Sequence, residues 1–362
     1  MRSISILSPT NVSAFSFNQL RERGLGGTET CILLLSKYLS DLGADVSLFG
    51  PFPVGHEGKL KLFPYAHAEL MDHDLFIYAR NLWQSDSPDI RYNQGAVWVH
   101  DTGFNSVNKW RLNRIDRILA LTQWHKKRIL EEYPYVNPGS ILVTQNGIRS
   151  DKFKYRSPKV NGKFIYSSGP DRGLKNLIDM WPAIKKSIPA ASLHIFNGFD
   201  LWEACNSHNN ATLNEINEIK SKIKDYKSLD VHHRGLVGQD ELAKEMSESL
   251  LWLYPTDFTE TFCISAVEAQ CAGCRVVASN LAALKETVHF GQLIDGDSAQ
   301  SEYRNKFIQA VKEEYENYNT NDISSQNRFI SNKYDWKSTA KQWISDYLNT
   351  SSLPGYGLLD SI

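Results

Sequence analysis

The stretch "LLWLYPTDFTETFCISAVEAQCAGCRVVASN", residues 250–280, contains the signals of a strand, a loop, a helix and a second strand in direct succession. The apolar run 250–256 predicts a buried strand, and "DFTET" predicts the loop that follows it. "FCISAVEAQCAG" predicts a helix that ends at Gly273, and "RVVAS" predicts the next strand. Strands joined by a helix run parallel, so this stretch favours an α/β fold with a mostly parallel sheet.

The same alternation recurs through most of the chain. Strands are predicted in the first half at 3–7, 44–50, 74–79, 96–100, 117–122 and 140–147, and in the second at 164–168, 192–198, 230–235, 250–255, 275–279 and 291–295. A polar stretch with glycine and proline separates the halves. We therefore predict two Rossmann-like, doubly wound domains over residues 1–155 and 156–333, with a last helix at about 334–350 returning to the first domain. Ligands should bind at the carboxyl ends of the strands, in the cleft between the domains.

Composition restricts the class of protein further. The chain has 362 residues, of which 41% are hydrophobic and 22% charged, as in a soluble enzyme. A formal net charge of −1 argues against a nucleic-acid partner. The sequence has no signal-peptide pattern and no apolar run long enough for a bilayer, which predicts a cytoplasmic protein. Cys271 and Cys274 have C-x-x-C spacing without a second ligand pair, so we expect buried thiols and no metal site.

Positive charge is concentrated in residues 109–133, which carry seven Lys or Arg against three Asp or Glu. Trp110 and Trp124 lie among these basic side chains. This pattern fits a solvated helix, strand and helix. It also fits a surface that makes peripheral contact with an anionic membrane face or an acidic acceptor, and the sequence leaves both readings open.

Two carboxylates in the opening stretch need a partner. Glu260 precedes the predicted helix and Glu268 lies within it among small apolar residues, where an unpaired carboxylate is costly. Treated as helical positions eight apart, they point the same way and can address one ligand. The N–H groups of Phe262, Cys263 and Ile264 at the helix N-terminus suit a diphosphate, and the vicinal hydroxyls of a ribose suit Glu268. The alternative is an acidic cap and a surface glutamate.

Loops after strands in the first half offer further candidates. Gly26 and Gly27 precede a helix predicted to begin near Thr28, so their backbone can approach an anion or a hydroxyl-rich ligand. Their spacing is not the G-x-G-x-x-G of a dinucleotide site, which weighs against a dehydrogenase. His100 and Asp101 stand where the strand 96–100 ends, at the edge where ligands bind, although a lone histidine can equally be structural.

In the second half, "YSSGPDRGLKNL" follows a strand and opens a helix. Arg172 lies just before this helix and Lys175 in its first turn. A cation at a helix N-terminus is unfavourable unless an anion is its partner. Arg172 is therefore a candidate for bidentate phosphate binding, with a plain surface residue as the alternative.

The segment "ETFCISAVEAQCAGCRVVAS" resembles the E-x(7)-E motif of the retaining, GT-B fold glycosyltransferases grouped as family 4. The resemblance extends to "GLGGTE", to His100, to "LTQWHKKRIL" and "TQNGI", and to "ALKETV" with Glu286. It implies transfer of a sugar from a nucleotide diphosphate sugar, UDP- or GDP-linked, with retained anomeric configuration and with no cofactor or obligatory metal. The acceptor would be a hydroxyl of a glycan, a lipid-linked molecule or a small molecule.

The resemblance also implies roles for individual residues. Glu268 would bind the ribose, Glu260 the donor sugar, and His100 would touch that sugar as well. The family usually places an Arg and a Lys several residues apart before a Gly, whereas "SSGPDRGLKNL" is shorter, so Lys175 is expected to supply the second charge beside Arg172. The backbone at Gly26, Gly27, Phe262, Cys263 and Ile264 would meet the phosphates.

Three other classes remain as alternatives to a transferase. A nucleotide-sugar hydrolase or epimerase could share the fold and the donor site. A non-catalytic protein that binds sugar nucleotides would bind the donor without transferring it. A Rossmann dehydrogenase is the weakest of the three, because the glycine fingerprint is missing.

Overall fold

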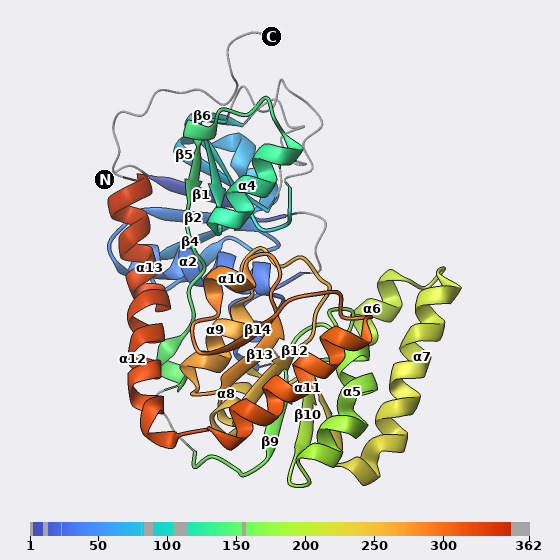
Figure 1. The fold of residues 1–362 in the computed structure, drawn as a ribbon. Helices are drawn as coiled ribbons and strands as arrows, with labels where there is room; N and C mark the ends of the chain where they lie inside the picture. The colour runs from blue at the N-terminus through green and yellow to red at the C-terminus, as the bar shows by residue number, and fades with distance from the viewer. Residues whose placement is uncertain are drawn as a thin grey trace. The chain divides into compact units, whose positions relative to one another are not determined.

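The computed structural model describes residues 3–9, 14–22, 24–80, 82, 90–103, 115–153 and 157–348. Contacts between Cα atoms divide the chain into two compact units. Unit 1 comprises Met1–Arg21, Leu25–Gly147 and Lys333–Ile362, and unit 2 comprises Glu22–Gly24 and Ile148–Asn332. Each unit is described by itself (Figure 1).

Unit 1 contains an eight-stranded sheet in the order β3-β4-β2-β1-β5-β6-β7-β8. All neighbouring strands pair in parallel except β3 and β4, which are antiparallel. Most strands are buried, as expected when helices cover a parallel sheet. The strands are β1 (Ile4–Leu7), β2 (Val46–Gly50), β3 (Gly55–Glu57), β4 (Leu60–Pro64), β5 (Asp72–Arg80), β6 (Arg91–Val99), β7 (Arg117–Ala120) and β8 (Ile141–Val143).

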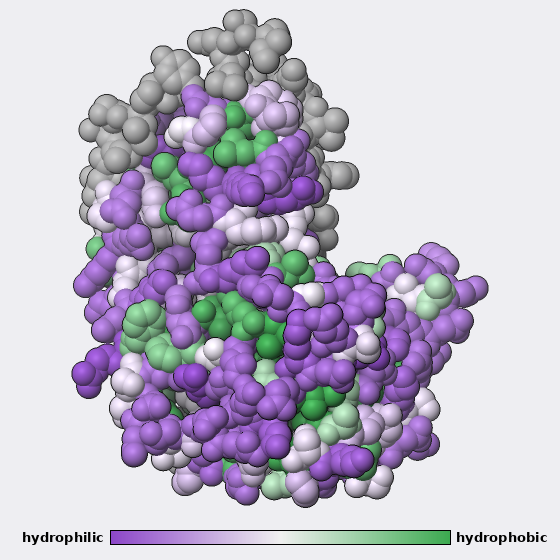
Figure 2. All heavy atoms as spheres, in the orientation of Figure 1, coloured by the Kyte–Doolittle hydropathy of each residue, from purple (hydrophilic) through white to green (hydrophobic). Residues whose placement is uncertain are grey.

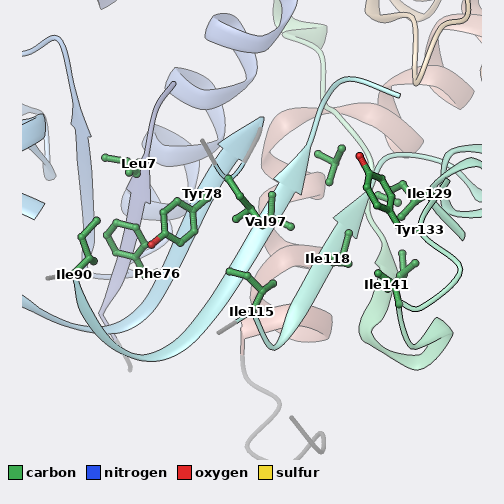
Figure 3. Packing of buried hydrophobic residues seen from close by; sticks show 14 of the residues in the cluster. Leu7, Phe76, Tyr78, Ile90, Val97, Ile115, Ile118, Ile129, Tyr133 and Ile141 are labelled. Atoms are coloured by element: carbon green, nitrogen blue, oxygen red, sulfur yellow. The ribbon is translucent and has the colours of Figure 1, made fainter. Parts of the chain in front are cut away.

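The helices of unit 1 are α1 (Phe17–Glu22), α2 (Gly27–Asp41), α4 (Gln123–Glu132) and α13 (Trp336–Gln342), with a π-helical segment at Trp343–Leu348 and 3₁₀ turns at Tyr65–Leu70 and Pro138–Ser140. The Thr122 hydroxyl starts α4 by accepting a hydrogen bond of 3.1 Å from the His125 N–H. Figure 3 shows part of the core, where Phe76 and Tyr78 of β5 share one apolar cluster with Ile129 of α4. The C-terminal α13 packs against α2.

Unit 2 contains a six-stranded parallel sheet in the order β11-β10-β9-β12-β13-β14. From β9 the chain adds β10 and β11 on one side of the sheet and then β12, β13 and β14 on the other. The boundary between β9 and β12 is therefore the topological switch point, where ligands bind in open α/β sheets. The strands are β9 (Lys163–Tyr166), β10 (Ser192–Phe196), β11 (Val231–Gly235), β12 (Leu251–Tyr254), β13 (Arg275–Ser279) and β14 (Gly291–Ile294).

Helices of unit 2 follow its strands as the alternation predicts. They are α5 (Leu174–Ser187), α6 (Asp200–Cys205), α7 (Asn210–Asp225), α8 (Gln239–Glu248), α9 (Ile264–Cys271), α10 (Leu284–Thr287), α11 (Ser301–Glu316) and α12 (Ile323–Tyr334), with 3₁₀ turns at Ser150–Phe153, Tyr226–Leu229 and Thr320–Asp322. The surface seen in Figure 2 is largely hydrophilic over this unit. Within the described ranges, no helix combines the length and the apolar character needed to cross a bilayer.

Every predicted strand is present, and the predicted fold class is confirmed: the chain has two Rossmann-like units, one with a mostly parallel sheet and one with a fully parallel sheet. The short β3 and β4 were not predicted from the sequence. The predicted domain boundary at 155/156 stays a prediction, whereas the contact-based units change over at 147/148 and 332/333. The first part of the basic segment 109–133, through residue 114, lies outside the described residues, as do positions 349–350 of the predicted last helix.

Candidate functional site

The loop after β9 reaches the loop after β12 through a close backbone approach at Gly173. This residue has φ +98°, and a Cβ atom there would lie 2.4 Å from the Pro255 carbonyl oxygen. No side chain fits in that space, so glycine is required both by conformation and by contact. The approach brings Arg172, just before α5, to the loop that carries Glu260.

Arg172 and Glu260 form an ion pair in which the Arg172 Nη1 lies 3.2 Å from Glu260 Oε1. The Tyr254 hydroxyl donates a second hydrogen bond of 2.6 Å to the same oxygen. Glu260 is 6% exposed, so its carboxylate is buried with two donors. The Arg172 guanidinium also lies over the Phe258 ring, 4.1 Å from its centroid. The structure thus brings together two of the predicted catalytic residues, Arg172 and Glu260.

The charge states in this cluster are set by burial and by Glu260. Burial alone would lower the pKa of the Arg172 guanidinium, but the Glu260 carboxylate and other neighbours outweigh it, and the pKa is raised. Burial, together with Glu260, raises the pKa of Tyr254 well above its usual range. Arg172 therefore stays charged and Tyr254 stays a protonated donor at any physiological pH.

The first turn of α9 begins beside this cluster. Its N-cap residue, Cys263, has a left-handed backbone with φ 65° and no side-chain cap bond. A non-glycine residue in this region stores about 1 kcal/mol of strain or more, which is typical of ligand-binding loops. Burial raises the pKa of the Cys263 thiol well above its usual range, so the thiol is neutral. The backbone around Phe262, Cys263 and Ile264 is consequently what this turn offers to an anion.

Glu268 lies in α9 itself. The prediction that Glu260 and Glu268 lie on one face of the same helix is wrong. Helix α9 begins at Ile264, so Glu260 belongs to the preceding loop and does not share a helical face with Glu268. Burial raises the pKa of the Glu268 carboxyl to about 7, an effect that the charge of Arg149 partly offsets. Within the described part of the chain, no hydrogen-bond donor is assigned to its side chain.

Arg149 is a neighbour of this site that was not predicted from the sequence. Its Nη1 donates a 3.2 Å hydrogen bond to the Gln239 side chain at the start of α8. The 3₁₀ turn at Ser150–Phe153, which follows Arg149, contacts both α8 and α9. Arg149 is thereby held near the carboxylate of Glu268.

Lys175 has partners of its own on α5 and α7. Its ammonium lies 2.9 Å from Asp179 and 3.3 Å from Glu218, and Lys222 shares both of these carboxylates. The hydrogen bond to Asp179 raises the pKa of Lys175 above its usual value. Its charge is balanced in this network, and its predicted role as a second phosphate-binding cation stays a prediction.

The site residues predicted in the first half of the chain belong to unit 1. His100 follows β6, and burial lowers its pKa to about 3, with the charges of His125 and Arg80 acting in the same direction. The imidazole is therefore neutral at pH 7. Asp101 pairs with Arg80 at 2.9 Å. Gly26 is the N-cap of α2 and Gly27 its first residue, one position earlier than the sequence predicts.

The cysteines Cys271 and Cys274 are buried free thiols. The Cys274 thiol donates to the Met246 carbonyl at 3.2 Å. Among the described residues, no group of three or more His, Cys, Asp or Glu side chains could hold a metal ion.

The chain is similar to known proteins in part of its sequence and in its fold. Residues 162–317 match the family model described as Glycosyl transferases group 1. The fold is GT-B: the chain superposes on AviGT4, a glycosyltransferase involved in avilamycin A biosynthesis, with a TM-score of 0.68, 14% identity and coverage of 96% of this chain and 97% of AviGT4. It also superposes on Anabaena HepE in complex with UDP, with a TM-score of 0.67, 16% identity and coverage of 96% and 99%.

A curated sequence relative is the phosphatidylinositol N-acetylglucosaminyltransferase GPI3 subunit of Saccharomyces cerevisiae, which is 22% identical over 274 residues. The match covers 72% of this chain and 55% of the yeast protein. The chain therefore spans about half the length of the curated relative that it matches.

Proposed function

We propose that the protein is a retaining glycosyltransferase that moves a sugar from a nucleotide diphosphate sugar to an acceptor hydroxyl. One observation carries the proposal: Arg172 and Tyr254 hold the buried Glu260 carboxylate at the sheet switch point, directly before the uncapped N-terminus of α9. The group 1 family match over residues 162–317 and the GT-B fold support it. A cation and a fixed carboxylate from two neighbouring loops, placed beside a helix N-terminus, suit a phosphorylated sugar.

In this proposal the nucleotide half of the donor binds unit 2. The diphosphate meets the N–H groups around Phe262, Cys263 and Ile264, and the ribose hydroxyls donate to Glu268. Ligand hydroxyls would supply the hydrogen bonds that no described side chain supplies to this carboxylate. A UDP or GDP donor is proposed on the resemblance, and the HepE structure in complex with UDP is consistent with the former.

Arg172 would stabilise the leaving group. As the anomeric bond breaks, the sugar gains oxocarbenium character and negative charge accumulates on the β-phosphate, so a fixed cation there lowers the barrier. The structure assigns one Arg172 side-chain hydrogen bond, from Nη1 to Glu260, within the described ranges. The other guanidinium N–H groups can therefore turn to phosphate oxygens.

Retention is proposed through departure and attack on the same face of the sugar. Glu260 is held by Arg172 and Tyr254 through one oxygen, an arrangement that suits an acceptor of sugar hydroxyls rather than a nucleophile. No covalent sugar adduct is then needed. A trapped glycosyl-enzyme intermediate would contradict this step.

Two assignments are predictions from the resemblance: His100 is assigned to the donor sugar, and Gly26 and Gly27 to the phosphates. The basic pattern of residues 109–133 is the ground for assigning them to a membrane face or an acidic acceptor. A neutral imidazole at His100 is compatible with a hydroxyl or carbonyl partner. The acceptor is proposed to be a glycan, a lipid-linked molecule or a small molecule.

A thermal-shift screen against UDP, GDP, ADP and their glucose or mannose derivatives would identify the donor. A ligand at 100 times its Kd stabilises the folded protein by about 2.7 kcal/mol, which gives a clear rise in Tm. The best donor is then incubated with candidate acceptors, and NMR of the product gives the anomeric configuration. Rapid donor turnover without any acceptor would identify a hydrolase, donor binding without turnover a binding protein, and an inverted product would contradict retention.

Donor affinity should rise with pH through Glu268. A hydroxyl donates to the ionised carboxylate, and the pKa of this group is about 7, so about a tenth is ionised at pH 6 and about nine tenths at pH 8. We expect the Kd of the best nucleotide sugar to be about tenfold weaker at pH 6 than at pH 8, as measured by calorimetry. Glu268→Gln should bind weakly at both values. A wild-type Kd that stays constant from pH 6 to pH 8 would contradict the assignment.

A further inference from the structure

Glu260 is held through one of its two carboxylate oxygens. Arg172 Nη1 and the Tyr254 hydroxyl both bond to Oε1, at 3.2 and 2.6 Å. Throughout the described ranges, no donor is assigned to Oε2. A carboxylate fixed in this way has one oxygen committed to the protein and one oxygen available to a ligand.

Tyr254 is itself fixed by a second hydrogen bond. The Ser168 hydroxyl bonds to the Tyr254 hydroxyl at 3.2 Å, and both groups are buried. Tyr254 ends β12 and Ser168 follows β9, and these strands are neighbours in the sheet. The ring of Tyr254 packs against Trp252 and Tyr166, with centroid distances of 4.7 and 6.0 Å. The two hydroxyls are therefore held in the buried interior of unit 2.

The chain of hydrogen bonds has a single direction. The carboxylate of Glu260 can only accept, so the Tyr254 O–H must donate to it. The Tyr254 oxygen then accepts from the Ser168 hydroxyl. Burial keeps Tyr254 protonated by raising its pKa well above the usual range. Chains of this kind stabilise one orientation of their last acceptor.

We infer that Tyr254 is a positioning residue for sugar recognition: it fixes the Glu260 carboxylate so that Oε2 faces a hydroxyl of the donor sugar, and Ser168 orients the Tyr254 hydroxyl. The inference rests on the proposed function. It assigns the Ser168–Tyr254–Glu260 chain to the sugar half of the donor. The nucleotide half depends on Glu268 and the first turn of α9 and is independent of this chain.

The test compares each nucleotide sugar with its parent nucleotide. UDP and UDP-glucose, GDP and GDP-mannose, and ADP and ADP-glucose are titrated calorimetrically into wild type, and the tightest pair is then used for Tyr254→Phe and Ser168→Ala. We expect Tyr254→Phe to raise the Kd of the nucleotide sugar about tenfold and to change the Kd of the parent nucleotide by no more than about twofold. The kcat for sugar transfer should fall by about 10- to 100-fold. Ser168→Ala should show the same pattern with a loss of about two- to fivefold.

Tyr303→Phe is the matched control. Tyr303 is a buried tyrosine of the same unit whose hydroxyl bonds to the Ser279 hydroxyl at 2.7 Å, so the control removes an equivalent buried hydroxyl without touching Glu260. Its Tm should fall about as much as that of Tyr254→Phe, with nucleotide-sugar affinity unchanged.

Two results would overturn the inference while the proposed function stands. In the first, Tyr254→Phe binds the nucleotide sugar and transfers the sugar as well as Tyr303→Phe does. In the second, Tyr254→Phe loses as much affinity for the nucleotide as for the nucleotide sugar, so the role of Tyr254 is structural. If wild type binds none of the three nucleotide sugars, the proposed function is wrong and the inference fails with it.

Discussion

Replacing Glu260 by glutamine should lower kcat for sugar transfer by about 10²- to 10³-fold, with a much smaller change in nucleotide affinity. Glutamine keeps the volume of the side chain but removes the negative charge that Arg172 and Tyr254 bond at 3.2 and 2.6 Å. Its amide also replaces one accepting oxygen by a donor, so a sugar hydroxyl loses its acceptor. Losses of this size, about 3 to 4 kcal/mol, are typical when one preorganised polar group of a transition-state site is removed.

The control for Glu260→Gln is Glu314→Gln. Glu314 pairs with Arg275 at 2.8 Å, and the exposed fractions of the two side chains, 32% for Arg275 and 10% for Glu314, are close to the 37% and 8% of Arg172 and Glu260. The control therefore removes a carboxylate from a similar environment at the other end of the sheet, where β13 begins. Both variants should lose a similar amount of Tm, and only Glu260→Gln should lose transfer. Half of wild-type activity in a folded Glu260→Gln protein would contradict the assignment.

Replacing Arg172 by alanine should lower kcat by a similar factor of about 10²- to 10³-fold, because the growing charge on the leaving phosphate loses its cation. The KM for the acceptor should change little, since Arg172 is assigned to the donor. Guanidinium ions added to the assay should restore part of the activity, because the small cation can occupy the space left by the side chain. Initial rates of nucleotide diphosphate release, with and without guanidinium at subdenaturing concentration, measure both effects.

Arg275→Ala separates chemistry from stability in this experiment. Each substitution leaves a nearly buried glutamate without its arginine, which costs less than the roughly 3 to 5 kcal/mol of a fully buried pair because each arginine side chain is about one third exposed. We expect a fall in Tm in both variants, but loss of transfer and guanidinium rescue only in Arg172→Ala. If Arg275→Ala loses as much transfer, the effect of Arg172 is a folding effect.

The fold was predictable because its signals are local. Runs of apolar residues within 250–256 and 275–279 indicate buried parallel strands. Glycine or polar loops separate these strands from the helices. The exceptions are β3 and β4. β3 has only three residues, "GHE", with little apolar character, and it pairs with β4 through a turn at Gly58, so no periodic pattern marks it.

The site was predictable in its residues but not in its geometry. Glu260, Glu268 and Arg172 stood out as charged groups in strand-end loops or in an apolar helix. The expectation that Glu260 and Glu268 share one helical face was wrong, because the left-handed backbone of Cys263 starts α9 four residues after Glu260. Lys175 was expected to serve the phosphates, and the structure pairs its ammonium with Asp179 and Glu218, which no local pattern indicated.

The sequence by itself determined the order of strands, loops and helices, and the loops in which charged residues stand, because these depend on residue patterns a few positions long. Only the tertiary structure decided which oxygen of Glu260 is held and by which groups. Arg172 lies 88 positions from Glu260 along the chain, and Ser168 lies 86 positions from Tyr254. The pairing of β9 with β12 and the close approach at Gly173 bring these side chains together, and no local pattern encodes such contacts.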